Sequence, residues 1–267
     1  MLSGLTRQIV KRAAPIAALA LGAALSGCAY VNDWEDVRGV PLAELDTSGE
    51  APTHISLAGP DKVVISEGDS LTITIEGNSD AGEALRFDRD GNRLSIARDR
   101  KVYDGSGSAT VLMTMPAPGE LSIAGSGRIE SATLARTAEL EIAGSGAISV
   151  ESVEADRLEV EIAGSGDVLA AGTASVLSVE IAGSGDVRLG DLNADDVSVS
   201  IAGSGNVTVA SNGTVDASIA GSGDVVVNGS ATCSVSSAGS GSLTCRPNEQ
   251  NAASATEDEE SEEVAAD

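Results

Sequence analysis

The chain has 267 residues, of which 41 are acidic and 16 are basic, and its formal net charge is −25. This charge excludes nucleic acid as a partner, because nucleic-acid binding needs a basic surface. Aromatic residues make up 1% of the chain and glycine numbers 31, a composition that favours small stacked β units over a helical globule.

Residues 1–27 have the pattern of a signal peptide. Arg7, Lys11 and Arg12 precede the apolar run AAPIAALALGAAL, and small residues follow it. This order of a basic region, a short apolar region and small residues is typical of a secretory signal, and the run is short for a membrane span.

The stretch LSGC at 25–28 resembles the lipobox of bacterial lipoproteins. The resemblance implies cleavage before Cys28 and lipid on its sulfur and amine, and Ala29 after it implies transport to the outer membrane. Each buried CH₂ contributes about 0.8 kcal/mol, so several acyl chains hold a protein on a membrane. The alternative is an ordinary secretory signal that contains a cysteine. Residues 28–53 are predicted to be a lipid-anchored tether, and which face of the outer membrane they occupy stays open.

Residues 54–118 predict short strands with irregular spacing. The stretches HISLAG, DKVVISEG, SLTITIEG, RLSIAR and ATVLMTM are rich in β-branched residues, and Asp90-Gly91 favours a hairpin turn. They are expected to form irregular β coils or a small cap at the N-terminal end of the domain. PAPG at 116–119 marks the start of a regular segment.

Residues 119–246 repeat one pentapeptide. IAGSG occurs six times from residue 123 onward, a seventh copy reads SAGSG at 237–241, and the copies are 18–20 residues apart. A repeat of this length predicts a solenoid, in which each unit buries its apolar face by stacking on its neighbours.

Within one unit, apolar and polar residues alternate. Leu158, Val160 and Ile162 alternate with Glu159 and Glu161, as in a half-buried strand. The predicted fold is therefore all-β: a right-handed parallel β-helix of about seven regular coils, preceded by irregular coils. Seven coils at a spacing of about 4.8 Å make a rod of about 34 Å.

The glycines of GSG are predicted to face inward. Either the turn needs a positive φ, or the opposite wall leaves no room for a Cβ. The serine between them is expected to form an outward column of hydroxyl groups, so the motif shapes the coil.

Cys233 and Cys245 both occupy inward positions in the last, divergent unit. With Cys28 lipidated, two thiols remain in an oxidising compartment. We expect a Cys233–Cys245 disulfide that closes the open end of the last coil, the alternative being two buried free thiols. Residues 247–267 are predicted to be a disordered acidic tail, because they contain too little apolar surface to bury.

The opening ISLAGPDKVVISEGDSLTITIEG at 55–77, GNRLSIA at 91–97 and the serial IAGSG units resemble the GIN domain family, the head domain of autotransporter adhesins. The resemblance covers about 190 residues, assigned here to a GIN-type domain at 54–246. It implies an all-β, helix-like fold on exported proteins, many of them lipoproteins, and it provides no catalytic residues.

Three functions compete. A polysaccharide-active enzyme is disfavoured, because sugar sites usually offer aromatic faces and glycosidases need two placed carboxylates; we therefore expect no enzyme and no catalytic residues. Calcium binding is an alternative, because stacking would align carboxylates in columns, and the candidate ligands are Asp167, Asp186, Asn206 and Asp224. The favoured function is a non-catalytic structural or adhesion-like role in the cell envelope, with an unidentified envelope or cell-surface macromolecule as partner and no cofactor.

Overall fold

The computed structural model describes residues 39–103, 105 and 107–246. The predicted signal peptide, Cys28 and the acidic tail lie outside these residues. The described strands are β1 (His54–Gly59), β2 (Lys62–Glu67), β3 (Thr72–Gly77), β4 (Leu85–Asp90), β5 (Arg93–Arg98), β6 (Ala109–Met115), β7 (Glu120–Gly125), β8 (Arg128–Thr133), β9 (Thr137–Gly144), β10 (Ala147–Gly164), β11 (Asp167–Gly183), β12 (Asp186–Gly203), β13 (Asn206–Gly221), β14 (Asp224–Asn228), β15 (Thr232–Gly239) and β16 (Ser242–Arg246). The described helices are the 3₁₀ turn η2 (Leu42–Glu44) and α2 (Ser79–Glu83).

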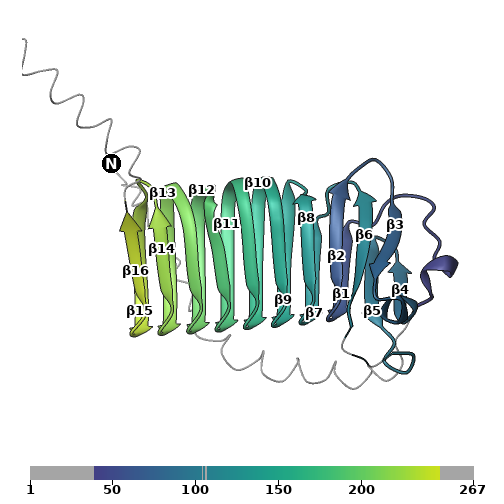
Figure 1. Ribbon diagram of the computed structural model, residues 1–267. Coiled ribbons are helices and arrows are strands. Elements are labelled where there is room, and N and C mark those ends of the chain that lie inside the picture. The colour runs from purple at the N-terminus through teal and green to yellow at the C-terminus, as the bar shows by residue number, and fades with distance from the viewer. Residues whose placement is uncertain (1–38, 104, 106, 247–267) are drawn as a thin grey trace, which may run out of the picture. The chain divides into compact units, whose positions relative to one another are not determined.

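The described unit is a parallel β-solenoid, as the repeat predicts. Each coil stacks in register on the next, so that Val160 pairs with Leu140 on one side and with Val179 on the other. Figure 1 shows the coils as a row of parallel arrows between β7 and β16. The inward residues Leu158 and Ile162 are 0% and 2% exposed. The alternation of apolar and polar residues therefore correctly predicts which side chains lie in the core and which lie on the outer walls.

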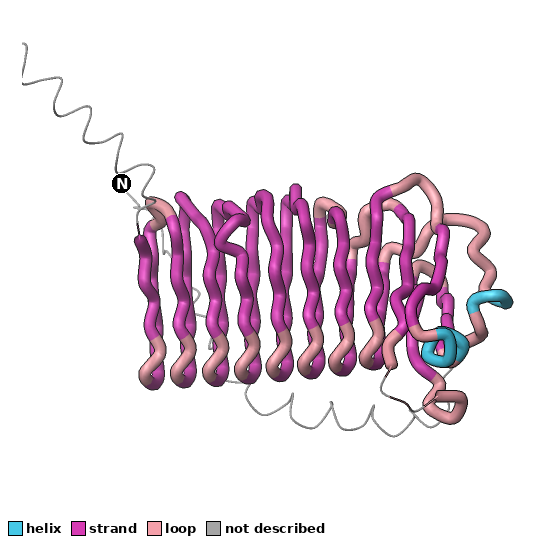
Figure 2. The backbone as a smooth tube through the Cα atoms, viewed as in Figure 1, coloured by secondary structure: helices cyan, strands magenta, loops and turns pink. Residues whose placement is uncertain are grey.

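The GSG turns stack at one edge of the solenoid, where Figure 2 shows a row of loops. The first glycine needs both conformation and space: Gly183 has φ +140°, and a Cβ there would collide with the carbonyl oxygen of Gly164. The second glycine needs space, since a Cβ on Gly185 would lie 2.6 Å from the carbonyl oxygen of Gly166. The close neighbour is thus the preceding coil and not the opposite wall, because identical turns lie directly on one another.

The serine of each turn lies outside, as expected. Ser184 is exposed, and its backbone N–H donates to the carbonyl oxygen of Gly164 at 2.8 Å. The same bond recurs from coil to coil, for example from Ser204 to Gly183 at 2.8 Å. The turn edge is therefore held by a ladder of main-chain hydrogen bonds that leaves the hydroxyl groups free of the core.

The N-terminal part contains both irregular coils and a cap. β1 and β2 form a coil that stacks on β7 and β8, and β5 and β6 form the coil beyond it, so the spatial order differs from the chain order. β3 and β4 then pair antiparallel with β6 and β5, and the β4–β5 hairpin contains the predicted Asp90-Gly91 turn. These antiparallel strands, with α2, close this end of the solenoid (Figure 1).

A buried ion pair lies in the first turn of this region. Asp61 takes the place of the second glycine of GSG, since its carbonyl oxygen accepts from the N–H of Arg128 as that of Gly127 accepts from Ala147. Asp61 is 1% exposed, and its side chain pairs with Arg98, whose Nε lies 3.1 Å from Oδ2 of Asp61. The sequence pattern did not predict this pair.

Loop 99–108, of which residues 99–103, 105 and 107–108 are described, stands where other coils have their tight turn, and its described residues contact this ion pair. Arg98 donates to the carbonyl oxygen of Gly107 at 2.8 Å and lies 5.5 Å from the centre of the Tyr103 ring. The N–H of Ala109 donates to Oδ1 of Asp61 at 2.8 Å. Both charges are thus satisfied by hydrogen bonds inside the fold.

The described part of the predicted tether, residues 39–53, packs on this end of the solenoid. Val40 and Phe87 exchange main-chain hydrogen bonds of 2.9 and 2.8 Å. Leu42, Leu45 and Ala51 pack against the core. The segment from residue 39 therefore lies against the solenoid.

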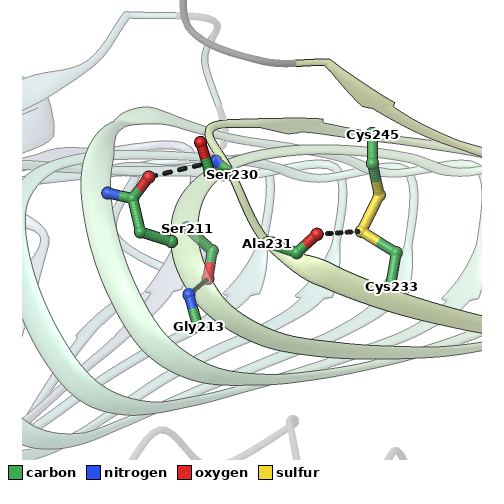
Figure 3. The surroundings of a disulfide bond; sticks show 7 residues. Ser211, Gly213, Ser230, Ala231, Cys233 and Cys245 are labelled. Carbon is green, nitrogen blue, oxygen red and sulfur yellow. Dashed lines mark hydrogen bonds between the residues drawn. A yellow bond between two sulfur atoms is a disulfide. The ribbon is translucent and has the colours of Figure 1, made fainter. Parts of the chain in front are cut away.

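The last coil contains the predicted disulfide. Cys233 in β15 and Cys245 in β16 are joined across the coil, with their Cα atoms 6.8 Å apart (Figure 3). Cys233 pairs in register with Val215 and Cys245 with Val227, both of which are buried. The expectation of a bridge between two inward positions is confirmed.

Removing the disulfide is expected to destabilise the solenoid. Replacing both Cys233 and Cys245 by alanine should lower the free energy of unfolding by about 3 kcal/mol, the value for closing a loop of this length. Urea unfolding of the chain from Arg38 onward measures the loss. Reductant should produce a similar loss in the wild type and none in the variant, and equal midpoints for all samples would contradict the prediction.

Candidate functional site

One outer wall of the solenoid has two columns of glutamates. Register pairing aligns Glu120, Glu139 and Glu159 in the first column and Glu141, Glu161 and Glu180 in the second. The sequence predicts both columns, because equal positions in successive coils stack. Neighbouring carboxylates in a column belong to strands about 4.8 Å apart, so the wall concentrates negative charge.

Basic groups lie at one end of this acidic wall. Oε2 of Glu120 lies 3.1 Å from Nδ1 of His54, and Oε1 lies 2.8 Å from a guanidinium nitrogen of Arg93. Both partners come from the coils beyond β7. Only the first glutamate of the column is therefore directly paired with them.

The inner members of the columns resist ionisation. Partial burial, followed by the charges of Glu120, Glu159 and Glu141, raises the pKa of Glu139 above its ordinary value, and His54 acts in the opposite direction. Partial burial, followed by the charge of Glu180 and then the other glutamates, likewise raises the pKa of Glu161. These two carboxyl groups therefore bind protons more readily in the folded chain than in the unfolded chain.

This pKa difference predicts a pH-dependent effect of charge removal. A carboxyl whose folded pKa is raised destabilises the fold above that pKa, and the penalty disappears as the pH falls toward the ordinary value of 4.5. Replacing Glu139 or Glu161 by glutamine should therefore raise the melting temperature at pH 7 and have little effect near pH 4. Because like charges on paired strands repel, removing one of them should raise the free energy of unfolding at pH 7 by about 0.2–1 kcal/mol.

Thermal unfolding at the two pH values measures this effect. Glu76→Gln, which removes an exposed charge from β3 away from the wall, is the matched control and should change neither melt. A gain at pH 7 that persists undiminished at pH 4 would show that the charge is not its cause.

The same wall loses its charge toward the C-terminal end. The first column continues with Ser178, Ser198, Asp216 and Ser234, and the second with Ser200, Ser218 and Ser236. A neighbouring column consists of alanines such as Ala202 and Ala220. The wall thus has an acidic half and a half of small, mostly neutral side chains.

The candidate calcium ligands lie in one column on the other wall. Asp167, Asp186 and Asn206 stack in register, and Asp224 follows, its N–H donating to Oδ1 of Asn206 at 3.3 Å. Arg188 lies 3.3 Å from Asp167 and 3.1 Å from Asp186.

Hydrogen bonds continue along this column. Asn206 donates to Asp186 at 2.9 Å, and Ser242 donates to Asp224 at 2.6 Å. In the described part of the chain, no group of three or more His, Cys, Asp or Glu side chains could hold a metal ion. Calcium binding stays a prediction, for which the melting temperature in millimolar Ca²⁺ and in chelator is the check.

Two further features bear on chemistry. Phe87 is buried, and Tyr103 lies beside Arg98 in loop 99–108, so neither forms part of an aromatic sugar platform. A hollow of about 510 Å³ lies between residues 39–48 and β4, and Arg89 there donates to the carbonyl oxygens of Asp46 and Ser48 at 3.1 and 3.0 Å.

Among the described helices, none has the length and apolar character to cross a membrane.

A comparison with protein families gives a match over most of the solenoid. The family described as "Putative auto-transporter adhesin, head GIN domain" matches residues 51–231. A search of the curated proteins found no match.

Solved structures share the fold. A "putative adhesin" from Bacteroides fragilis has a TM-score of 0.67 at 22% identity, covering 74% of this chain and 93% of its own. A "putative lipid binding protein" from Parabacteroides distasonis has a TM-score of 0.58 at 22% identity, with the same coverage. A "putative adhesin" from Parabacteroides merdae has a TM-score of 0.56 at 17% identity, covering 74% and 92%. At these identities the likeness establishes the fold alone.

Proposed function

The chain belongs to the GIN domain family of adhesin heads, and from this premise we propose that it is a lipid-anchored protein of the bacterial cell envelope that binds another macromolecule without catalysis. The family suggests a cell-envelope or surface protein. The lipobox-like LSGC stretch supports attachment through Cys28, and Ala29 supports the outer membrane as its location.

The observation that carries the proposal is the rigid acidic wall. Main-chain pairing fixes Glu120, Glu139 and Glu159 in line, and fixes Glu141, Glu161 and Glu180 beside them. Keeping Glu139 and Glu161 ionised in this wall is unfavourable, because partial burial and, after it, the charges of the neighbouring glutamates raise the pKa of both carboxyl groups. A fixed charged surface suits binding, because a rigid partner loses little conformational freedom on association. The wall fits a partner with a positively charged or hydroxyl-rich surface.

Protease shaving of intact cells tests the location. Wild type is compared with Cys28→Ala, and an antibody against the tail follows both proteins. Membrane-bound wild type that is digested from outside, with the variant released from the membrane, supports a surface adhesin. Membrane-bound protein that resists digestion places the partner in the periplasm and ends the adhesion role. Equal membrane attachment of Cys28→Ala would overturn the lipid anchor.

Binding through the wall has its own test. Glu141→Gln with Glu180→Gln removes two exposed charges, and retention of the soluble chain on fixed cells or envelope fractions is measured. Retention should fall for this variant and stay unchanged for the Glu76→Gln control. Equal retention of all three proteins would show that the wall is not the binding surface.

A further inference from the structure

The two ends of the solenoid differ. The N-terminal end is closed by β3, β4 and α2. At the other end, within residues 39–246, β15 pairs only with β13 and β16 only with β14. The outer main-chain edge of both strands therefore faces outward without a partner strand among the described residues.

The interior of the last coil is also exposed. Val235 occupies an inward position but is 50% exposed, whereas Ala217, its partner in the coil before, is 4% exposed. Ser237 stands where Ile219 stands in that coil and is exposed. The disulfide ties the two walls together (Figure 3). It leaves the Val235 side of the coil exposed.

This edge has few of the features that prevent strand pairing. Natural edge strands usually carry charges, prolines or bulges. β15 reads TCSVSSAG, which contains no charge and no proline, and its pairing with β13 is continuous from Thr232 to Gly239. The two wall columns that end in β15 contain glutamates in β7 to β11 and Asp216 in β13, and they end in Ser234 and Ser236 here. Charge is thus low where a second sheet edge would approach.

We propose that the last coil, β15 with β16, is a self-association edge at which a second copy of this chain pairs its own last coil. A two-fold axis across the solenoid brings equal edges together with their strands antiparallel and forms one closed interface. β15 then faces a second, uncharged β15, and the charged residue of β16, Arg246, lies at the end of its strand. The chain's own segment 247–267 is poorly suited to pair with this edge, because it contains eight acidic residues and Val264 is its single large apolar residue.

The size of the edge sets the strength of the association. Eight residues of β15 span about 26 Å, and two walls about 10 Å apart with their outer side chains give an end surface of about 500 Å² per copy. A total of about 1,000 Å² is at the lower limit of specific interfaces. We therefore expect a dimer with a dissociation constant in the micromolar range, weakened by repulsion between the two acidic tails and strengthened by salt.

Sedimentation velocity of the chain from Arg38 onward tests the proposal, with and without residues 247–267. The chain that keeps residues 247–267 (the full chain) should dimerise at tens of micromolar in 0.5 M salt. The chain without them (the shortened chain) should dimerise more tightly at low salt. Val235→Lys places a charge on the edge and should leave only monomers. Leu169→Lys is the matched control, since Leu169 is also 50% exposed but lies in β11, and it should dimerise like wild type.

Three outcomes would overturn the proposal. Monomers of both chains at all salt concentrations would show that the edge does not self-associate. A full chain that stays monomeric in high salt while the shortened chain dimerises would identify the tail as the occupant of the edge. Equal loss of the dimer in Val235→Lys and Leu169→Lys, with unchanged melting curves, would place the interface elsewhere.

Discussion

Replacing Asp61 by asparagine is expected to lower the free energy of unfolding by about 3–5 kcal/mol, the cost of leaving a buried charge without its partner. Arg98 is 7% exposed and would keep its charge in a site built for an ion pair. The asparagine also replaces a charged acceptor of the Ala109 N–H with a neutral one. Urea unfolding at pH 7 measures the loss.

A surface ion pair provides the control. Lys62 and Glu130 lie 2.7 Å apart on neighbouring strands, with side chains 38% and 39% exposed. Lys62→Met should cost less than about 1 kcal/mol, because solvent screens exposed pairs. Losses of similar size for Asp61→Asn and Lys62→Met would mean that the buried pair contributes no more than a surface one.

Removing both charges distinguishes the effect of an unpaired buried charge from the effect of altered packing. Asp61→Asn combined with Arg98→Met removes both charges and should recover part of the stability lost in Asp61→Asn, since the uncompensated guanidinium is gone. If Arg98→Met destabilises the Asp61→Asn chain by as much as it destabilises the wild type, the two residues act independently.

The regular coils could be predicted because every coil repeats the same physical constraints. Leu158, Val160 and Ile162 alternate with acidic residues, and the 18–20-residue period places equal residues on one another, so the core and the glutamate columns follow from counting. The disulfide could be predicted for the same reason, since Cys233 and Cys245 replace inward apolar residues.

The N-terminal coils could not be placed in this way. AGPD at 58–61 is a divergent copy of AGSG, aligned with it through Ala58 and Gly59, but Pro60 and Asp61 hide the repeat. The partner of Asp61 lies 37 residues further on, and the strand order depends on β5 and β6 stacking outside β1 and β2. No period in the sequence encodes such a pairing. The aspartate at a glycine position was the one available signal.

Arg188 illustrates a second limit. Counting places Asp167, Asp186, Asn206 and Asp224 in a column, and this suggested calcium ligands. The guanidinium that lies between Asp167 and Asp186 comes from the neighbouring outward column. Which long side chain crosses from one column to the next depends on its rotamer, and the alternation of residues does not specify it.

Replacing a turn glycine in the middle of the solenoid is expected to have the other large effect. Alanine at Gly183 must adopt φ +140° and place its Cβ against the carbonyl oxygen of Gly164. The strained backbone and the overpacking each cost about 1–3 kcal/mol, so we expect a loss of about 2–6 kcal/mol.

Ser184→Ala in the same turn is the control for this glycine. Its side chain is exposed, and alanine keeps the N–H that donates to Gly164 at 2.8 Å, so the change should stay within about 0.5 kcal/mol. Urea unfolding of both variants decides between two roles for the motif. A large loss for Gly183→Ala alone shows that GSG is kept because the stacked turns have no room for a Cβ. A tolerated Gly183→Ala would mean that the turn can relax, and the sevenfold recurrence of the motif would then need an explanation outside the packing of the coils.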